Sequence, residues 1–301
     1  MRVGKSHDVS RLEQLGPWVA RIAWLVLALA AGGSLADALA ERTDLARVVV
    51  VTVLSVGWTG GLVALLVPRT TSLTAVRLLV PAGLAVAIAA ALAGTTVDGA
   101  DLAAVTAGTV AVVAALSPWF TETWVDGSSY GPEHRLPLQT PPLLAVTVVP
   151  LTWLTAVVGA GAGPLLLAAG QWVPGAVALP VGAAVAVFAV RSLHQLSRRW
   201  VVLVPAGLVL HDPLALAEPQ LFPRLAVAAL RPAPAATDAL DLTVGATGLA
   251  LQLDLTQPVD LLVRRGRGQT ETVETGAVLF TPARPAHVLD RARQHRLRVP
   301  A

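Results

Sequence analysis

Six stretches of the sequence are long and apolar enough to cross a lipid bilayer. A membrane-spanning helix needs about 20 apolar residues, because each residue rises about 1.5 Å through a hydrocarbon layer about 30 Å thick. The stretches lie at residues 18–38, 48–67, 78–95, 102–120, 143–163 and 165–190. The composition agrees, since 54% of the residues are hydrophobic and 14% are charged. The sequence therefore predicts a membrane α-helical bundle of six transmembrane helices over residues 18–190, preceded by a retained tail at residues 1–17.

The basic residues between these stretches indicate an orientation, because cytoplasmic loops are enriched in arginine and lysine. With the N-terminus inside, only Arg42 and Arg47 fall outside. The basic residues that fall inside are Arg2, Lys5, Arg11, Arg69, Arg77, Arg135, Arg191, Arg198 and Arg199. This asymmetry predicts that both termini are cytoplasmic. Lys5 is the only lysine, and such an arginine-rich, alanine-rich chain is typical of a bacterial protein, so we expect a multi-pass protein of the bacterial plasma membrane.

Two local features refine the bundle. Gly163 and Pro164 alone separate the fifth stretch from the sixth, so the sequence predicts a tight hairpin there. The glycines at 57, 60 and 61 and at 159, 161 and 163 indicate either close helix contacts or a substrate path through unwound helices. No stretch carries a charged residue near its centre, which disfavours an ion-coupled transporter and favours close packing.

After Trp200 the pattern changes to short runs separated by turn residues. Leu249, Leu251, Leu253 and Leu255 alternate with smaller or polar residues, which is the period of a half-buried strand. We expect strands at residues 200–204, 208–212, 224–230, 240–244, 249–255, 259–264 and 270–280, and a helix at 285–297 whose buried stripe is Val288, Leu289 and Ala292. Residues 191–301 are thus predicted to form a small cytoplasmic β-barrel or sandwich domain capped by a helix.

The segment from Arg199 to Asp212, RWVVLVPAGLVLHD, together with several strands closed by one amphipathic helix, resembles the bacterial pleckstrin-homology-like (PH-like) domains that follow membrane helices. The whole chain resembles actinobacterial multi-pass membrane proteins of uncharacterised role, with an internal loop of the type DGSSYG ahead of a helical hairpin. The resemblance implies an architecture and a binding domain, but no activity.

The cytoplasmic loop at 121–142 concentrates the candidate interaction residues Asp126, Ser128, Tyr130, Glu133, His134 and Arg135. A serine, a histidine and an acid can perform nucleophilic catalysis, but Ser128 lacks a nucleophile-elbow sequence. Glu122, Asp126, Glu133 and His134 could hold a metal, but their spacing matches no known metal-binding loop. We therefore interpret the loop as a turn at Asp126 and Gly127 that packs against the soluble domain, and we expect no catalytic residue, metal or cofactor.

Basic residues of the soluble domain form two further candidates, a turn with Arg264, Arg265 and Arg267 and a helix end with Arg291 and Arg293. Such groups meet anionic lipid headgroups or form an ordinary solvated surface. Nucleic acid is not expected as a partner, because the other arginines lie at the edges of apolar stretches. The chain contains no cysteine, which excludes disulfides and thiolate metal sites.

The sequence thus predicts an integral membrane anchor or scaffold. Its cytoplasmic PH-like domain would bind another membrane or cytoplasmic protein, or anionic lipid headgroups. The alternative is a small-molecule transporter or membrane-embedded enzyme that uses the bundle itself. That alternative requires an open cavity at the bilayer midplane, lined by Trp58, Thr59, Thr152 and Trp153.

Overall fold

The computed structural model describes residues 4–94, 96–266 and 268–300, with side chains from Leu15 onward. The chain divides into two compact units. The helical unit comprises Met1–Trp124 and Leu151–His194, and the sheet unit comprises Val125–Pro150 and Gln195–Ala301. The sheet unit thus takes in the loop that precedes the fifth span, and its second segment begins at Gln195.

Six helices of the described chain are long and apolar enough to cross a membrane, which confirms the predicted number. They are α1 (Gly4–Leu39), α2 (Asp44–Leu66), α3 (Thr70–Ala93), α4 (Gly99–Leu116), α6 (Val149–Ala168) and α7 (Trp172–Leu196). The predicted fourth span was too long, because α4 ends at Leu116 and the short helix α5 (Pro118–Asp126) follows it. Asp98 caps α4 through the backbone N–H groups of Ala100 and Asp101, at 2.8 and 2.9 Å.

The predicted hairpin turn at Gly163 and Pro164 is wrong. Both residues lie inside α6, and the chain turns at Gly170, which has a φ of 76°. Gly163 instead gives room to α7, since a Cβ atom there would lie 2.5 Å from Leu179 Cα. Glycine at this position therefore marks a helix contact, and Pro164 is accommodated within an apolar helix, as happens in membrane segments.

Helices α1 to α3 are held around the indole of Trp24, which is 2% exposed. A Cβ atom on Gly61 or Gly83 would lie 2.7 or 2.5 Å from the Trp24 ring, so glycine at both sites lets the ring pack closely in its present position. Trp24 Nε1 donates to the Trp58 carbonyl at 3.1 Å, and Trp58 Nε1 donates to the Trp24 carbonyl at 3.4 Å. The glycines at 61 and 83 thus serve close packing around one large side chain.

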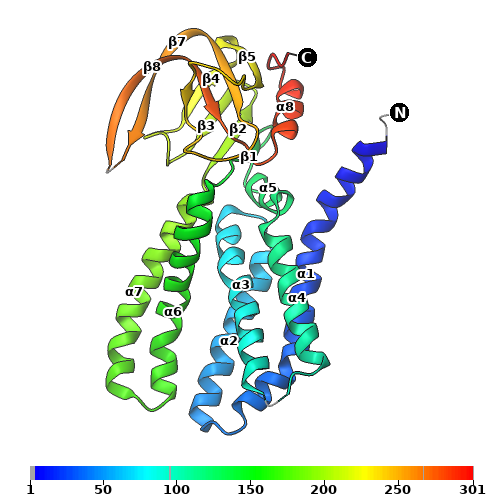
Figure 1. The fold of residues 1–301 in the computed structure, drawn as a ribbon, viewed down its shortest axis with the longest axis vertical. Helices are drawn as coiled ribbons and strands as arrows, with labels where there is room; N and C mark the ends of the chain where they lie inside the picture. Colours follow the sequence, from blue (N-terminus) through cyan, green and yellow to red (C-terminus); the bar gives the residue numbers. More distant parts are fainter. Residues whose placement is uncertain (1–3, 95, 267, 301) are drawn as a thin grey trace. The chain divides into compact units, whose positions relative to one another are not determined.

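The sheet unit contains two four-stranded sheets and the helix α8 (Pro285–Gln294) (Figure 1). The first sheet has the order β1-β2-β3-β4 and the second has the order β5-β7-β8-β6. The strands are β1 (His134–Pro137), β2 (Trp200–Val204), β3 (Gly207–His211), β4 (Gln220–Pro223), β5 (Val227–Pro232), β6 (Leu240–Asp241), β7 (Leu251–Arg265) and β8 (Gln269–Phe280). All neighbouring strands are antiparallel except β6 and β8.

The predicted strands differ from the observed ones in several places. The sequence pattern did not indicate β1, which comes from the internal loop, or β4, which lies in a proline-punctuated stretch. The predicted strand at 224–230 begins as a 3₁₀ turn, Arg224–Ala226, before β5. The predicted strands at 249–255 and 259–264 form one strand, β7, with an irregular register between Asp254 and Val259. A bulge of this kind breaks the alternation of side chains without ending the strand.

The two sheets and α8 enclose one apolar core. Leu203, Leu208, Leu251 and Val278 are completely buried in it. The predicted stripe of Val288, Leu289 and Ala292 packs α8 against this core, which confirms that assignment. Hydrogen bonds from Gln139 N to Thr281 O at 2.8 Å and from Ala283 N to Pro137 O at 2.9 Å join the segment around β1 to the end of β8.

Candidate functional site

The first sheet is apolar on both faces. Side chains alternate along a strand, so Val201 and Leu203 point into the core while Trp200, Val202 and Val204 point outward. The strand register places Arg135, Val202, Val209 and Leu221 in one row across the outer face. Trp200 pairs with His211 in the neighbouring outward row. A sheet with only one covered face normally carries polar residues on the other, so the valines and Leu221 make this outer face unusually apolar.

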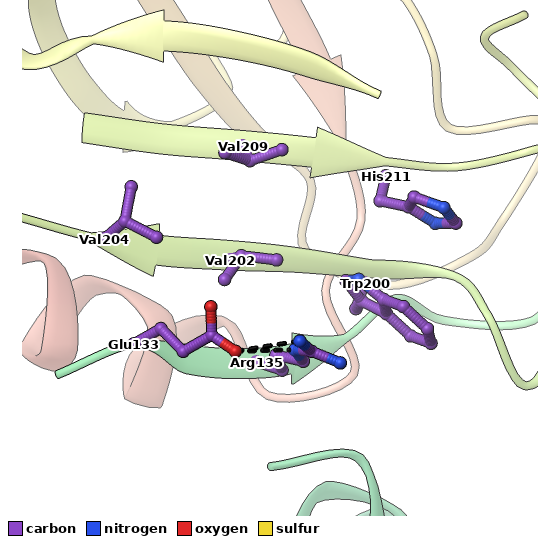
Figure 2. A pocket seen from close by; sticks show the side chains of 7 residues that line it. All are labelled: Glu133, Arg135, Trp200, Val202, Val204, Val209 and His211. Carbon is purple, nitrogen blue, oxygen red and sulfur yellow. Dashed lines mark hydrogen bonds and ion pairs between the residues drawn. The ribbon is translucent and has the colours of Figure 1, made fainter. Parts of the chain in front are cut away.

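A shallow pocket of about 270 Å³ lies on this outer face (Figure 2). Valines form its floor and polar or aromatic side chains stand around them. The pocket is lined by Glu133, Arg135, Trp200, Val202, Val204, Val209 and His211. Its volume lies just below the lower end of the range for small-ligand sites, about 300 Å³.

The polar and aromatic side chains of the pocket are held in place by contacts with their neighbours. Arg135 donates from Nη2 and Nε to Glu133 Oε1, at 2.8 and 3.1 Å. The Arg135 guanidinium also lies 5.7 Å from the centre of the Trp200 ring. His211 stacks on Trp200 with the ring centres 4.9 Å apart, and its Nδ1 lies 2.7 Å from the Arg198 carbonyl oxygen. These contacts fix the orientation of the side chains before anything binds, which lowers the entropic cost of binding.

The loop that leads into β1 is organised by Asp126. Its Oδ1 accepts hydrogen bonds from Ser129 Oγ at 2.8 Å and from the Arg135 backbone N–H at 2.9 Å, and its Oδ2 lies 3.6 Å from His134 Nδ1. In a catalytic triad the serine bonds to the histidine, whereas here both Ser129 and His134 contact the acid. The arrangement therefore organises a turn around the Asp126 carboxylate.

The other loop candidates lie close to this turn. The Ser128 backbone N–H donates to Val125 O at 3.3 Å, and the Tyr130 backbone N–H donates to Glu133 Oε1 at 2.8 Å. The Tyr130 side chain is 89% exposed. The structure thus brings Asp126, Glu133, His134 and Arg135 together beside the pocket and leaves the Tyr130 ring accessible to a partner.

His134 also contacts the end of α8. Its ring lies edge-on to His295, with the ring centres 5.4 Å apart. Burial lowers the pKa of His295, the nearby His134 and Arg291 lower it further, and a hydrogen bond with the Val204 backbone opposes this shift. His295 therefore links the end of α8 to β1 and β2, and these surroundings favour the neutral form of its imidazole.

The two arginine groups do not form one surface. Arg264 and Arg265 lie at the tip of the β7–β8 hairpin, at the opposite side of the sheet unit from α8 (Figure 1). Arg265 pairs with Glu271 at 2.7 Å, and Arg264 Nε donates to the Leu216 carbonyl at 3.1 Å. On α8, Arg293 pairs with Asp290 at 2.6 Å and Arg291 donates to His287 and Gln294. Arg267 lies outside the described residues.

Within the described ranges, no three histidine, aspartate or glutamate side chains lie close enough together to hold a metal ion. The indoles of the alternative transporter site take part in helix packing. Trp58 bonds to the Trp24 carbonyl, and Trp153 Nε1 donates to the Leu78 carbonyl at 3.0 Å. These bonds join helices, which is a structural role for both tryptophans.

Arg199, one of the basic residues that the sequence predicts on the cytoplasmic side, forms a buried ion pair. Its Nη2 lies 2.7 Å from Asp212 Oδ2, and the two side chains are 2% and 0% exposed. Its Nη1 donates to the Gln139 carbonyl at 2.9 Å, which ties the internal loop to β2. Arg199 is thus buried in the sheet unit. The sequence held a signal for this pair, since Arg199 and Asp212 flank the predicted β2–β3 hairpin symmetrically.

The chain thus combines six helices that are long and apolar enough to cross a membrane with a two-sheet unit. That unit has a pocket on one outer face. No known protein family, no curated protein and no solved structure matches the chain.

Proposed function

We propose that this chain is an integral anchor of the bacterial plasma membrane with both termini in the cytoplasm, and that its sheet unit is a PH-like binding domain. Six apolar helices support the membrane assignment. Two sheets closed by a C-terminal helix support the PH-like assignment. The bundle holds the domain at the membrane, where the domain docks another protein or anionic lipid headgroups.

One feature of the structure supports this proposal most directly. The outer face of the first sheet combines an apolar floor with a preorganised Arg135, Glu133, Trp200 and His211 rim, and the exposed Tyr130 stands on the adjoining loop. Apolar floors with a few fixed polar groups are typical of binding sites. Aromatic and arginine side chains are also the residues that contribute most to protein interfaces.

Site-specific photocrosslinking in the native host tests the docking role. A photoreactive residue in place of Tyr130 should form adducts with a discrete partner or with anionic lipid. The matched control is the same residue in place of Leu249, which is 52% exposed and lies just before β7. Equal, diffuse labelling from both positions would contradict the proposal.

A tag at Ala301 tests the topology. It should react with a membrane-impermeant reagent only after the cells are permeabilised. A tag that reacts in intact cells would show that the sheet unit lies outside and would overturn the cytoplasmic assignment.

A further inference from the structure

The outer face of the first sheet continues as an apolar surface beyond the pocket. Val204 and Val209 are half-buried, Leu221 on β4 is 43% exposed, and Leu225 in the turn after β4 is 89% exposed. Pro223 between them is also exposed. Single exposed apolar side chains are ordinary, whereas apolar side chains paired across one sheet face, as Val209 and Leu221 are, indicate a covered surface.

This sheet is tied to the membrane spans by short links. The last span, α7, ends at Leu196 and β2 begins at Trp200, so their ends are at most about 14 Å apart along an extended chain. At the other strand, β1 ends at Pro137 and the helical segment that continues into α6 begins at Leu144. Two neighbouring strands of this sheet are thus joined to spans by only a few residues each. Such short links keep the sheet close to the bilayer surface, which raises its effective concentration there.

The charges around the face complement an anionic membrane. Arg198, before β2, and Arg224, after β4, are both exposed. Glu133 is the acidic residue of the pocket, and its charge is offset by its ion pair with Arg135.

We propose that the outer face of the first sheet lies on the bilayer interface. Leu221 and Leu225 reach the boundary between headgroups and acyl chains, and Arg224 contacts lipid phosphate. The inference rests on the membrane anchoring proposed above. It goes further by assigning this face to the bilayer, while the Tyr130 loop remains available to a separate partner.

The absence of cysteine from the sequence provides a direct test. Single variants Leu221→Cys and Leu225→Cys, each labelled with an environment-sensitive fluorophore, are placed in nanodiscs that hold one copy of the full chain. The matched controls are Leu249→Cys and Leu262→Cys, whose wild-type side chains are 52% and 40% exposed on other parts of the sheet unit. Nitroxide-bearing lipids report contact with the bilayer, and iodide reports access from water.

The fluorophores at 221 and 225 should be quenched by the nitroxide lipids and should show a several-fold loss of iodide quenching relative to both controls. Iodide quenching equal to the controls would overturn the proposal, because the face would then be solvated. Shielding from iodide without quenching by lipid would also overturn it, since protein would then cover the face. Neither result affects crosslinking from Tyr130, so failure here is distinguishable from failure of the docking role.

Discussion

The helical unit and the sheet unit achieve tight packing in different ways. In the helical unit, glycines admit a ring or a backbone, and side chains donate to helix carbonyls, as Trp124 Nε1 does to Ala64 O at 3.0 Å and Arg21 Nε to Leu65 O at 2.8 Å. The sheet unit has a core of aliphatic side chains pinned by the buried pair of Arg199 and Asp212. The two units therefore depend on different kinds of residue for their stability.

The physical reason is the surrounding solvent. Lipid tails are as apolar as leucine, so helices in a bilayer gain little from burial and depend on close fit and hydrogen bonds. A sheet core gains stability by removing apolar surface from water. A charged pair inside such a core is tolerated only while both partners are present. Substitutions that alter fit should therefore matter most in the helical unit, and substitutions that break a charge pair should matter most in the sheet unit.

The largest effect is expected from Arg199→Met. It leaves Asp212 buried without its cation, which typically costs about 3–5 kcal/mol. Hydrogen exchange of the β2 and β3 amides in the full chain should accelerate by about 10²–10³-fold or more, since each tenfold change corresponds to about 1.4 kcal/mol.

Two variants of the same region control that experiment. Arg198→Met removes the exposed neighbouring arginine and should leave exchange almost unchanged. The double variant Arg199→Met/Asp212→Leu removes both charges and should recover much of the lost protection. If the double variant were as labile as Arg199→Met, the buried charge would not be the cause.

The second effect is expected from Gly182→Ala, which probes fit between backbones. The new Cβ would lie 2.3 Å from the Gly159 carbonyl oxygen on the facing helix, so α6 and α7 must separate. Overpacking of this kind costs about 1–3 kcal/mol. The thermal midpoint of the detergent-solubilised protein should fall, whereas Gly161→Ala, whose Cβ would meet only a Leu165 methyl group at 3.9 Å, should leave it unchanged. Equal midpoints for the two variants would show that the glycine contact does not hold these helices.

The sequence predicted the parts of the fold that depend on repeated patterns. The six apolar stretches and the stripe on α8 follow from length and periodicity, and the structure has both. The turn at Gly170 and the contact at Gly163 could not be distinguished, because a glycine beside a proline has the same local sequence in a turn and in a helix contact. Local chemistry therefore predicted elements better than it predicted their boundaries.

The sequence indicated only some of the residues of the candidate site. The loop residues Asp126, Glu133 and Arg135 stood out by their polarity; Glu133 and Arg135 line the pocket, and Asp126 bonds to the Arg135 backbone. The pairing of β1 with β2 brings together residues that are more than 60 positions apart, such as Arg135 and Val202. No local pattern encodes a contact of that range, so Trp200 and His211 were not recognised as members of the same site.

A smaller effect is expected from Gly61→Ala, because the new Cβ would meet a side chain, which can move, and not the backbone of a facing helix. Its Cβ would lie 2.7 Å from Cζ2 of the Trp24 ring, and a ring can shift where a carbonyl on a facing helix cannot. Alanine also favours a helix over glycine by about 1 kcal/mol, which offsets part of the clash. The thermal midpoint should therefore fall less than in Gly182→Ala. A larger fall would reverse the comparison between ring-filled and backbone-filled glycine sites.

The smallest effect is a pH dependence confined to the sheet unit. Because burial and the nearby His134 lower the pKa of His295, the unfolded chain binds a proton there more readily than the folded chain does. The His295 contribution to stability is complete above the ordinary histidine pKa of about 6.5 and decreases as the pH falls below it. Thermal unfolding between about pH 7.5 and 4.5 should show this loss, and His295→Gln should flatten it.

Asp254 separates this effect from acid unfolding in general. Burial alone would raise the pKa of Asp254, but hydrogen bonds from Arg231 and Gln252 lower it below its usual value. Its contribution is present above the ordinary aspartate pKa of about 3.9 and is lost only below it. A decline that began near pH 4 and persisted in His295→Gln would assign the effect to carboxylates. A decline that began near pH 6.5 and disappeared in that variant would assign it to the contact between His134 and His295.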